Sequence, residues 1–244
     1  MTAPLVPVAH GSRDPRSAAT VRGLVERVRD QAPGAEVYES FLDLSEPRVT
    51  DVLRRLYEQG HRSAVVVPLL LGSAFHARVD LPALVAEVQA DCPGFDVRVS
   101  EVLGVDPVLE EVALDRLAGA GLGGPGSGLV VSAVGSSNAG ANAAVADLAA
   151  RWETRLGVPV SEAFASAAQP DVPAAVRRLR ARGVERIAVA SWFLAPGLLP
   201  DRIAALAREA DRGVYLAGPL GTDPRVAAAV LRRYEAAQNR VSAP

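Results

Sequence analysis

Short apolar runs alternate with segments of helical periodicity along the whole 244-residue chain. The runs are rich in Val and Leu with few polar positions between them, which is typical of strands buried on both faces of a parallel sheet. Strands are expected over residues 4–9, 36–42, 63–70, 96–102, 128–134, 159–164, 186–193 and 213–217. Helices are expected over residues 15–30, 47–59, 80–91, 106–118, 139–156, 171–182, 200–210 and 223–238. This alternation predicts an α/β protein.

The second half of the chain repeats the order of the first. The segment "LVPVAHGS" returns as "LVVSAVGS", "VYESFLDLSEP" as "VSEAFASAAQP", and "LGVDP" as "LGTDP". Each match falls at the same place in its half, which indicates an internal duplication. We therefore expect two similar doubly wound parallel-sheet units, residues 1–118 and 129–244, joined by a Gly-rich linker over residues 119–128.

The linker contains "GLGGPG", which satisfies the glycine spacing of a dinucleotide-binding loop. That fingerprint must follow a strand and open a helix, whereas residues 121–126 follow an expected helix and lead into an expected strand. A Walker A loop is also excluded, because the chain contains no lysine. The glycines are therefore interpreted as a flexible connection.

Composition excludes several classes of protein. The formal net charge of −2 argues against a surface for nucleic acid or anionic membrane. The lone Cys92 excludes an intramolecular disulfide, and a thiolate zinc site or iron–sulfur cluster held by this chain alone. The longest apolar run, residues 65–75, is too short to cross a bilayer, and the first residues lack the pattern of a secretory signal. We expect a cytoplasmic protein.

Two of the three histidines, His10 and His76, lie just past the ends of apolar strands. In an open parallel sheet, residues just beyond the carboxyl ends of the strands line the crevice where ligands bind. Imidazole is the commonest neutral metal ligand and titrates near neutral pH. The placement predicts a metal or proton-transfer site. His61, between a helix and a strand, is interpreted as solvated and structural.

The first strand-to-helix turn is kept in both halves. Gly11 and Ser12 recur as Gly135 and Ser136. Small residues fit a tight turn here, and a serine at this place either caps the helix or binds an anion at the helix N-terminus.

Three candidate metal ligands of the first half have no counterpart in the second half. His10, Asp43 and His76 stand opposite, respectively, Val134, Ser166 and Leu199. A histidine packed under a loop needs no function, but the joint loss of all three from the second half favours a functional role in the first. Glu46 is the alternative to Asp43 as the acidic residue.

The segments "VAHGSRDP", "ESFLDLSEP" and "VVVPLLLGSAFHARVDLP" resemble those of the class II tetrapyrrole chelatases of the sirohydrochlorin type, which include siroheme-forming ferrochelatases and the anaerobic cobaltochelatases of cobalamin synthesis. The resemblance covers nearly the whole chain. It implies that His10 and His76 are catalytic and bind the metal, together with Asp43, although the family often has glutamate at the position of Asp43.

The resemblance further implies insertion of a divalent metal into sirohydrochlorin, with Fe²⁺ favoured and Co²⁺ as the alternative. The metal would be a substrate, and no permanently bound cofactor is expected. Relatives with a single unit build their site from a homodimer. We therefore expect this duplicated chain to act as a monomer, with a homodimer as the alternative.

The implied substrate carries many carboxylates, which predicts arginines in its pocket. All 26 cationic side chains of the chain are arginines, and these bind carboxylates in a bidentate manner. Arg13, Arg48 and Arg78 each lie just after an expected strand or in the first turn of the next helix, where the helix dipole also favours an anion. With Ser12, they are the expected substrate contacts.

Two other functions fit some of these residues. A non-catalytic carrier of a tetrapyrrole or metal would use the same side chains without turnover. A serine hydrolase with Ser12 or Ser136 as nucleophile is disfavoured, because neither serine stands in a G-x-S-x-G motif. Multiple-turnover metal insertion would separate an enzyme from a carrier.

Overall fold

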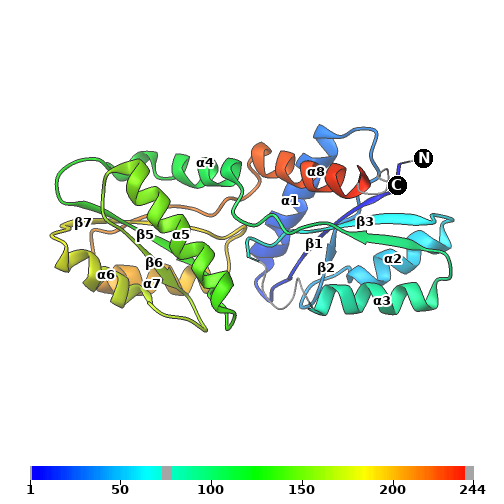
Figure 1. The fold of residues 1–244 in the computed structure, drawn as a ribbon, viewed down its shortest axis with the longest axis horizontal. Helices are drawn as coiled ribbons and strands as arrows, with labels where there is room; N and C mark the ends of the chain where they lie inside the picture. Colours follow the sequence, from blue (N-terminus) through cyan, green and yellow to red (C-terminus); the bar gives the residue numbers. More distant parts are fainter. Residues whose placement is uncertain (1, 73–78, 240–244) are drawn as a thin grey trace. The chain divides into compact units, whose positions relative to one another are not determined.

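The computed structural model describes residues 2–72 and 79–239, and these contain two parallel four-stranded sheets (Figure 1). The strand order is β2-β1-β3-β4 in the first sheet and β6-β5-β7-β8 in the second. The first sheet consists of β1 (Leu5–Ala9), β2 (Ser40–Phe41), β3 (Ser63–Pro68) and β4 (Asp96–Val99). The second consists of β5 (Ser127–Ala133), β6 (Val160–Phe164), β7 (Arg186–Ser191) and β8 (Tyr215–Leu216). The expected α/β duplication is confirmed.

The central strands are buried because helices cover both faces of each sheet. Every residue of β1 and of β5 is buried. Such strands carry few polar side chains, which explains the near-continuous apolar runs in the sequence. Leu5 of β1 pairs with Val65 of β3, and this register places the carboxyl ends of the two strands at one edge of the sheet.

In the first unit, α1 and α8 lie on one face of the sheet and α2 and α3 on the other (Figure 1). The four helices are α1 (Pro15–Gln31), α2 (Val49–Glu58), α3 (Leu81–Asp91) and α8 (Pro224–Asn239). Val6, Val8 and Val66 of the sheet pack against Leu56 of α2 and Val85 of α3.

In the second unit, α6 and α7 share one core with β5, β6 and β7. Its helices are α4 (Pro107–Asp115), α5 (Ala139–Leu156), α6 (Val172–Ala181) and α7 (Leu198–Ala210). A short 3₁₀ helix covers residues 118–120. Within the two described ranges, no helix combines the length and the apolar character that crossing a bilayer requires.

The compact units differ from the expected division into residues 1–118, 119–128 and 129–244. One unit contains the chain up to Asp106 together with the chain from Thr222, and the other contains Pro107–Gly221. The reason is that each repeat gives its last helix to the other unit. Tertiary packing therefore cuts the chain at different points from the sequence repeat.

Specific contacts fix both exchanged helices. Glu110 of α4 accepts hydrogen bonds from Arg151 Nη2 at 2.8 Å and from Trp152 Nε1 at 2.9 Å, both on α5. Arg232 of α8 forms an ion pair with Asp106 at 3.0 Å. Each exchanged helix is thus held by contacts between side chains of the two repeats.

The Gly-rich stretch belongs to the second unit. It follows the 3₁₀ helix and continues into β5, which already begins at Ser127. Arg186 Nη2 donates to Ser127 Oγ at 3.0 Å, and Gly126 O accepts from Arg186 N at 2.9 Å. The last residues of the expected linker, Ser127 and Gly128, therefore belong to β5 and pair with β7.

Candidate functional site

The loops after β1 and β2 meet at the carboxyl edge of the first sheet. His10 directly follows β1, and Asp43 lies two residues beyond the end of β2. The Asp43 N–H donates to His10 O at 2.9 Å, which continues the pairing of the two strands into their loops. Two candidate residues far apart in sequence are thereby brought together.

Gly11 permits this close approach. Its φ is +91°, and a Cβ at this position would lie 1.6 Å from Asp43 O. A side chain is therefore excluded on both conformational and steric grounds. The second unit repeats the arrangement, because a Cβ on Gly135, with φ +85°, would lie 2.0 Å from Ser166 O. The turn serves the fold, which explains why its glycine occurs in both halves.

Ser12 is part of the hydrogen-bonding of the loop. Its N–H donates to Ser45 Oγ, and the Ser45 hydroxyl donates to Ser12 O, both at 3.1 Å. Ser12 Oγ in turn accepts from the Asp14 N–H at 3.1 Å. Asp14 caps α1 by accepting from the Arg16 N–H at 3.0 Å. These contacts give Ser12 a structural role at the turn.

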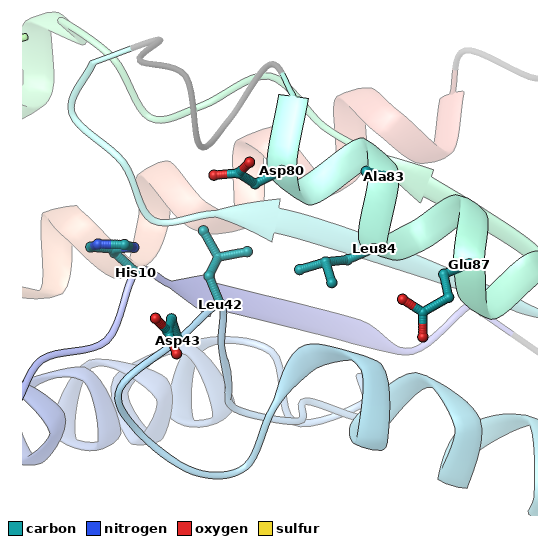
Figure 2. A pocket seen from close by; sticks show the side chains of 7 residues that line it. All are labelled: His10, Leu42, Asp43, Asp80, Ala83, Leu84 and Glu87. Carbon is teal, nitrogen blue, oxygen red and sulfur yellow. The ribbon is translucent and has the colours of Figure 1, made fainter.

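A pocket of about 380 Å³ opens beside these loops (Figure 2). Its lining residues come from the ends of β1 and β2 and from the start and middle of α3: His10, Leu42, Asp43, Asp80, Ala83, Leu84 and Glu87. The pocket therefore combines an imidazole and three carboxyl groups with a partly apolar wall. Such a set can bind a cation and exchange protons.

Asp43 is ionised in this setting. Hydrogen bonds from the Leu44 backbone N–H and from the Arg48 side chain hold the pKa of the Asp43 carboxyl below its usual value. The Arg48 contact joins Nη1 to Asp43 Oδ1 at 2.6 Å. Protonated His10 lowers the pKa of Asp43 further.

The structure brings together some of the expected site residues. His10 and Asp43 line the pocket, whereas Ser12, Arg13 and Arg48 are outside its described lining. His76 and Arg78 lie outside the described residues. In the part of the chain that the structure describes, no three His, Cys, Asp or Glu side chains are grouped to hold one metal ion.

The two acidic alternatives are separated by their positions. Asp43 lines the pocket, while Glu46 is exposed and contacts Arg48, with Oε1 at 3.4 Å from Nε. The geometry therefore supports Asp43 over Glu46 as the acidic residue near His10.

Asp80 and Glu87 were not expected at the site. They lie seven residues apart, just before α3 and in its middle, and both line the pocket. A different face of this helix buries Leu81, Val85 and Val88. The seven-residue spacing places both carboxylates on one face, which is a signal that the sequence contains.

The second unit carries uncharged residues at the same edge, with Val134 and Ser166 at the places of His10 and Asp43. The connection from β3 to α3 covers residues 69–80, whereas that from β7 to α7 covers only 192–197. Leu199, the residue expected opposite His76, lies inside α7 and packs on the core, while His76 lies outside the described residues. Matching Leu81 to Leu199 instead places Leu198 opposite Asp80.

Comparison with known proteins supports the duplication. The model of the CbiX family matches residues 4–120 and 128–237. A sirohydrochlorin cobaltochelatase of Priestia megaterium is 24% identical over 239 residues, covering 93% of this chain and 78% of that protein. A sirohydrochlorin ferrochelatase of Bacillus subtilis is 26% identical over 237 residues, covering 93% and 88%. The structure of SirB from Bacillus subtilis with Fe³⁺ has a TM-score of 0.84 at 24% identity, covering 99% and 98%, and so shares the fold.

Proposed function

Because the chain belongs to the CbiX family, we propose that it is a sirohydrochlorin chelatase, which inserts a divalent metal ion into the free-base tetrapyrrole. Relatives named for this activity with iron and with cobalt align with 93% of the chain. The observation that carries the proposal is the pairing of His10 with Asp43 in one pocket of the first unit. The second unit has Val134 and Ser166 at these places.

The chemistry requires removal of two pyrrole protons and of water from the metal. Neutral His10 accepts a pyrrole proton, and ionised Asp43 stabilises the imidazolium that results. Arg48 holds Asp43 in the charged form. In this proposal His76 is the second base, and His10, His76 and Asp43 share the metal ion before it enters the ring.

The rim carboxylates of the substrate need cationic partners. Arg13 is exposed just beyond the end of β1, where it can bind such a group. We assign Arg78 the same role on the basis of its place in the sequence. Arg48 already binds a carboxyl group of the protein, so its first role is to position Asp43. Ser12 contributes through the turn that it stabilises.

Imidazole and carboxylate ligands accept both Fe²⁺ and Co²⁺. We propose Fe²⁺ as the physiological metal and Co²⁺ as the alternative, since siroheme is required wherever sulfite or nitrite is reduced. In this proposal the protein is a cytoplasmic monomer, and the metal is a substrate rather than a resident cofactor.

An anaerobic absorbance assay tests the proposal. Sirohydrochlorin is mixed with purified protein and Fe²⁺ or Co²⁺, beside a control without protein. We expect multiple turnovers with the native chain and a loss of about 100-fold or more in His10→Ala, because a positioned proton acceptor contributes about 10²–10⁴-fold. His61→Ala is the matched control, since His61 faces Glu36, 3.6 Å away, and is not among the residues lining the pocket.

Three results would contradict the proposal. Stoichiometric binding of the ring without acceleration would indicate a carrier. Full activity in His10→Ala would show that His10 is not the base, and equal losses in His10→Ala and His61→Ala would point to general destabilisation.

A further inference from the structure

Ser45 connects the loop that carries Asp43 to the loop that carries His10. Its hydroxyl group accepts from the Ser12 N–H and donates to Ser12 O, both at 3.1 Å. One side chain thus binds both backbone polar groups of a residue on the neighbouring loop. We propose that Ser45 is a positioning residue for metal insertion, because it holds His10 and Asp43 in place relative to each other. This inference rests on the proposed chelatase function.

The contact between Ser45 and Ser12 lies close to both pocket residues. Ser12 follows His10 by two residues, and Ser45 follows the Asp43 position by the same number. The backbone bond from Asp43 N to His10 O, at 2.9 Å, would alone let the two loops hinge about one point. The Ser45 hydroxyl removes that freedom because it fixes a second point. The side chains of His10 and Asp43 then lie at the same end of the pocket (Figure 2).

The second unit binds the equivalent backbone groups with a side chain from a different element. There Asn142 of α5 accepts from the Ser136 N–H at 2.9 Å and donates to Ser136 O at 2.7 Å. Ala18 of α1 stands at the place of Asn142. Ala168, in the loop after β6, stands at the place of Ser45. Because neither alanine can form these bonds, each unit satisfies the same turn by its own route, and the route through the second loop belongs to the first unit.

The shape of the second loop does not depend on the serine. Leu44 has a φ of +60°, and its counterpart Ala167 has a φ of +55°. The second unit also keeps the bonds between its two loops, since Ser166 N lies 3.0 Å and the Ser166 hydroxyl 3.3 Å from Val134 O. The same loop pair therefore forms without the Ser45 hydroxyl. A purely structural role does not explain why that hydroxyl accompanies the imidazole and the carboxylate.

Proton transfer makes this geometry important. His10 accepts a pyrrole proton when its imidazole is within hydrogen-bonding reach, and a misplacement of about 1 Å costs about 100-fold in rate. Asp43 stabilises the resulting imidazolium by an attraction that falls with distance. Loss of the Ser45 hydroxyl leaves both groups present but lets their loops separate. The chemical step should therefore slow, whereas binding of the ring should not change.

Three variants separate positioning from stability. Ser45→Ala removes the contact, and Ser45→Thr keeps a hydroxyl at the same place. The matched control is Asn142→Ala, which removes the two equivalent bonds from the second unit. Thermal unfolding gives Tm, and the anaerobic assay with Co²⁺ gives kcat and the KM for sirohydrochlorin. NMR of the imidazole nitrogens, without ring or metal, reports on His10 directly, because the chain has three histidines and His10→Ala assigns its signals.

We expect Ser45→Ala to lower kcat about 10- to 100-fold and to leave the KM for sirohydrochlorin within about twofold. Ser45→Thr should restore kcat to within about threefold, and Asn142→Ala should retain it. Both alanine variants should lower Tm by about 2–8 °C, because each removes two hydrogen bonds from a half-buried turn. The His10 signals should move in Ser45→Ala alone, with those of His61 unchanged in every variant.

The inference is overturned if Ser45→Ala keeps the native kcat, if Asn142→Ala lowers kcat equally, or if the His10 signals do not move in Ser45→Ala. Failure of the proposed function looks different. The native chain would then insert no metal, while displaced His10 signals in Ser45→Ala alone would still support the positioning of His10 by Ser45.

Discussion

Replacing Gly11 by alanine tests the geometry of the site against an internal control. A Cβ on Gly11 would lie 1.6 Å from Asp43 O, and real contacts of this kind are not shorter than 3.0 Å. The loops after β1 and β2 must therefore separate by about 1.4 Å, the difference between these two distances. The same change at Gly135 requires about 1.0 Å, from 2.0 Å to 3.0 Å.

The two variants should lose similar stability. An alanine held at the positive φ costs about 1–3 kcal/mol, and weakening the hydrogen bond between the loops adds about 1 kcal/mol. That bond joins Asp43 N to His10 O in the first unit and Ser166 N to Val134 O in the second. For a chain of this size, a loss of about 2–4 kcal/mol lowers Tm by roughly 5–15 °C.

Activity should separate the two variants. A misplacement of about 1 Å at a catalytic group costs about 100-fold in rate, so Gly11→Ala should lose insertion to that extent even where it is folded. Gly135→Ala should retain most of it. Circular dichroism gives Tm, and the absorbance assay gives the rate at 20 °C below it. Equal loss of insertion in both folded variants would refute the assignment of the chemistry to the first unit, and an unchanged Tm in both would refute the close approach itself.

Two further predictions concern the second unit. Glu153 accepts from Arg182 and from the Val160 N–H, which lower its pKa from 4.5 to about 2. The ionised Glu153 carboxylate therefore stabilises the fold above pH 4.5, and this stabilisation is lost as the pH falls toward 2. Glu153→Gln should lower the free energy of unfolding by about 1–2 kcal/mol at pH 7, a value reduced because the side chain is partly exposed. Urea unfolding at low pH should show no difference in stability between the variant and the native chain. Trp152→Phe removes the hydrogen bond to Glu110 and should cost about 1–3 kcal/mol in thermal unfolding with insertion retained; an unchanged Tm would contradict the docking of α4.

Much of the fold follows from local pattern. Strands buried on both faces leave continuous apolar runs, and prolines mark several helix starts, so the sequence predicts the eight described strands and the eight described α-helices to within a few residues. The 3₁₀ helix over residues 118–120 was not predicted. The division into compact units does not follow. It depends on where α4 and α8 pack, which is decided by contacts such as Arg232 with Asp106, more than a hundred residues away in sequence.

The site was predictable where topology alone decides proximity. His10 and Asp43 follow neighbouring parallel strands, so their loops must meet at one edge. Asp80 and Glu87 were missed because an aspartate before a helix is ordinarily a cap, and a glutamate within a helix is ordinarily solvated. Only the direction of the side chains in the folded protein distinguishes these cases. Arg48 was expected to contact the substrate for the same reason, because the sequence does not show that its side chain is directed to Asp43.

The exchange of α4 and α8 has the form of a domain swap within one chain. Two single-repeat chains that each lend their last helix to the other would make a swapped dimer, and joining them end to end would give this topology. Neither half of the chain then contains all the segments of one compact unit. Proteolysis between residues 121 and 126 would yield two fragments that remain associated, because α4 stays packed in the second unit and α8 in the first.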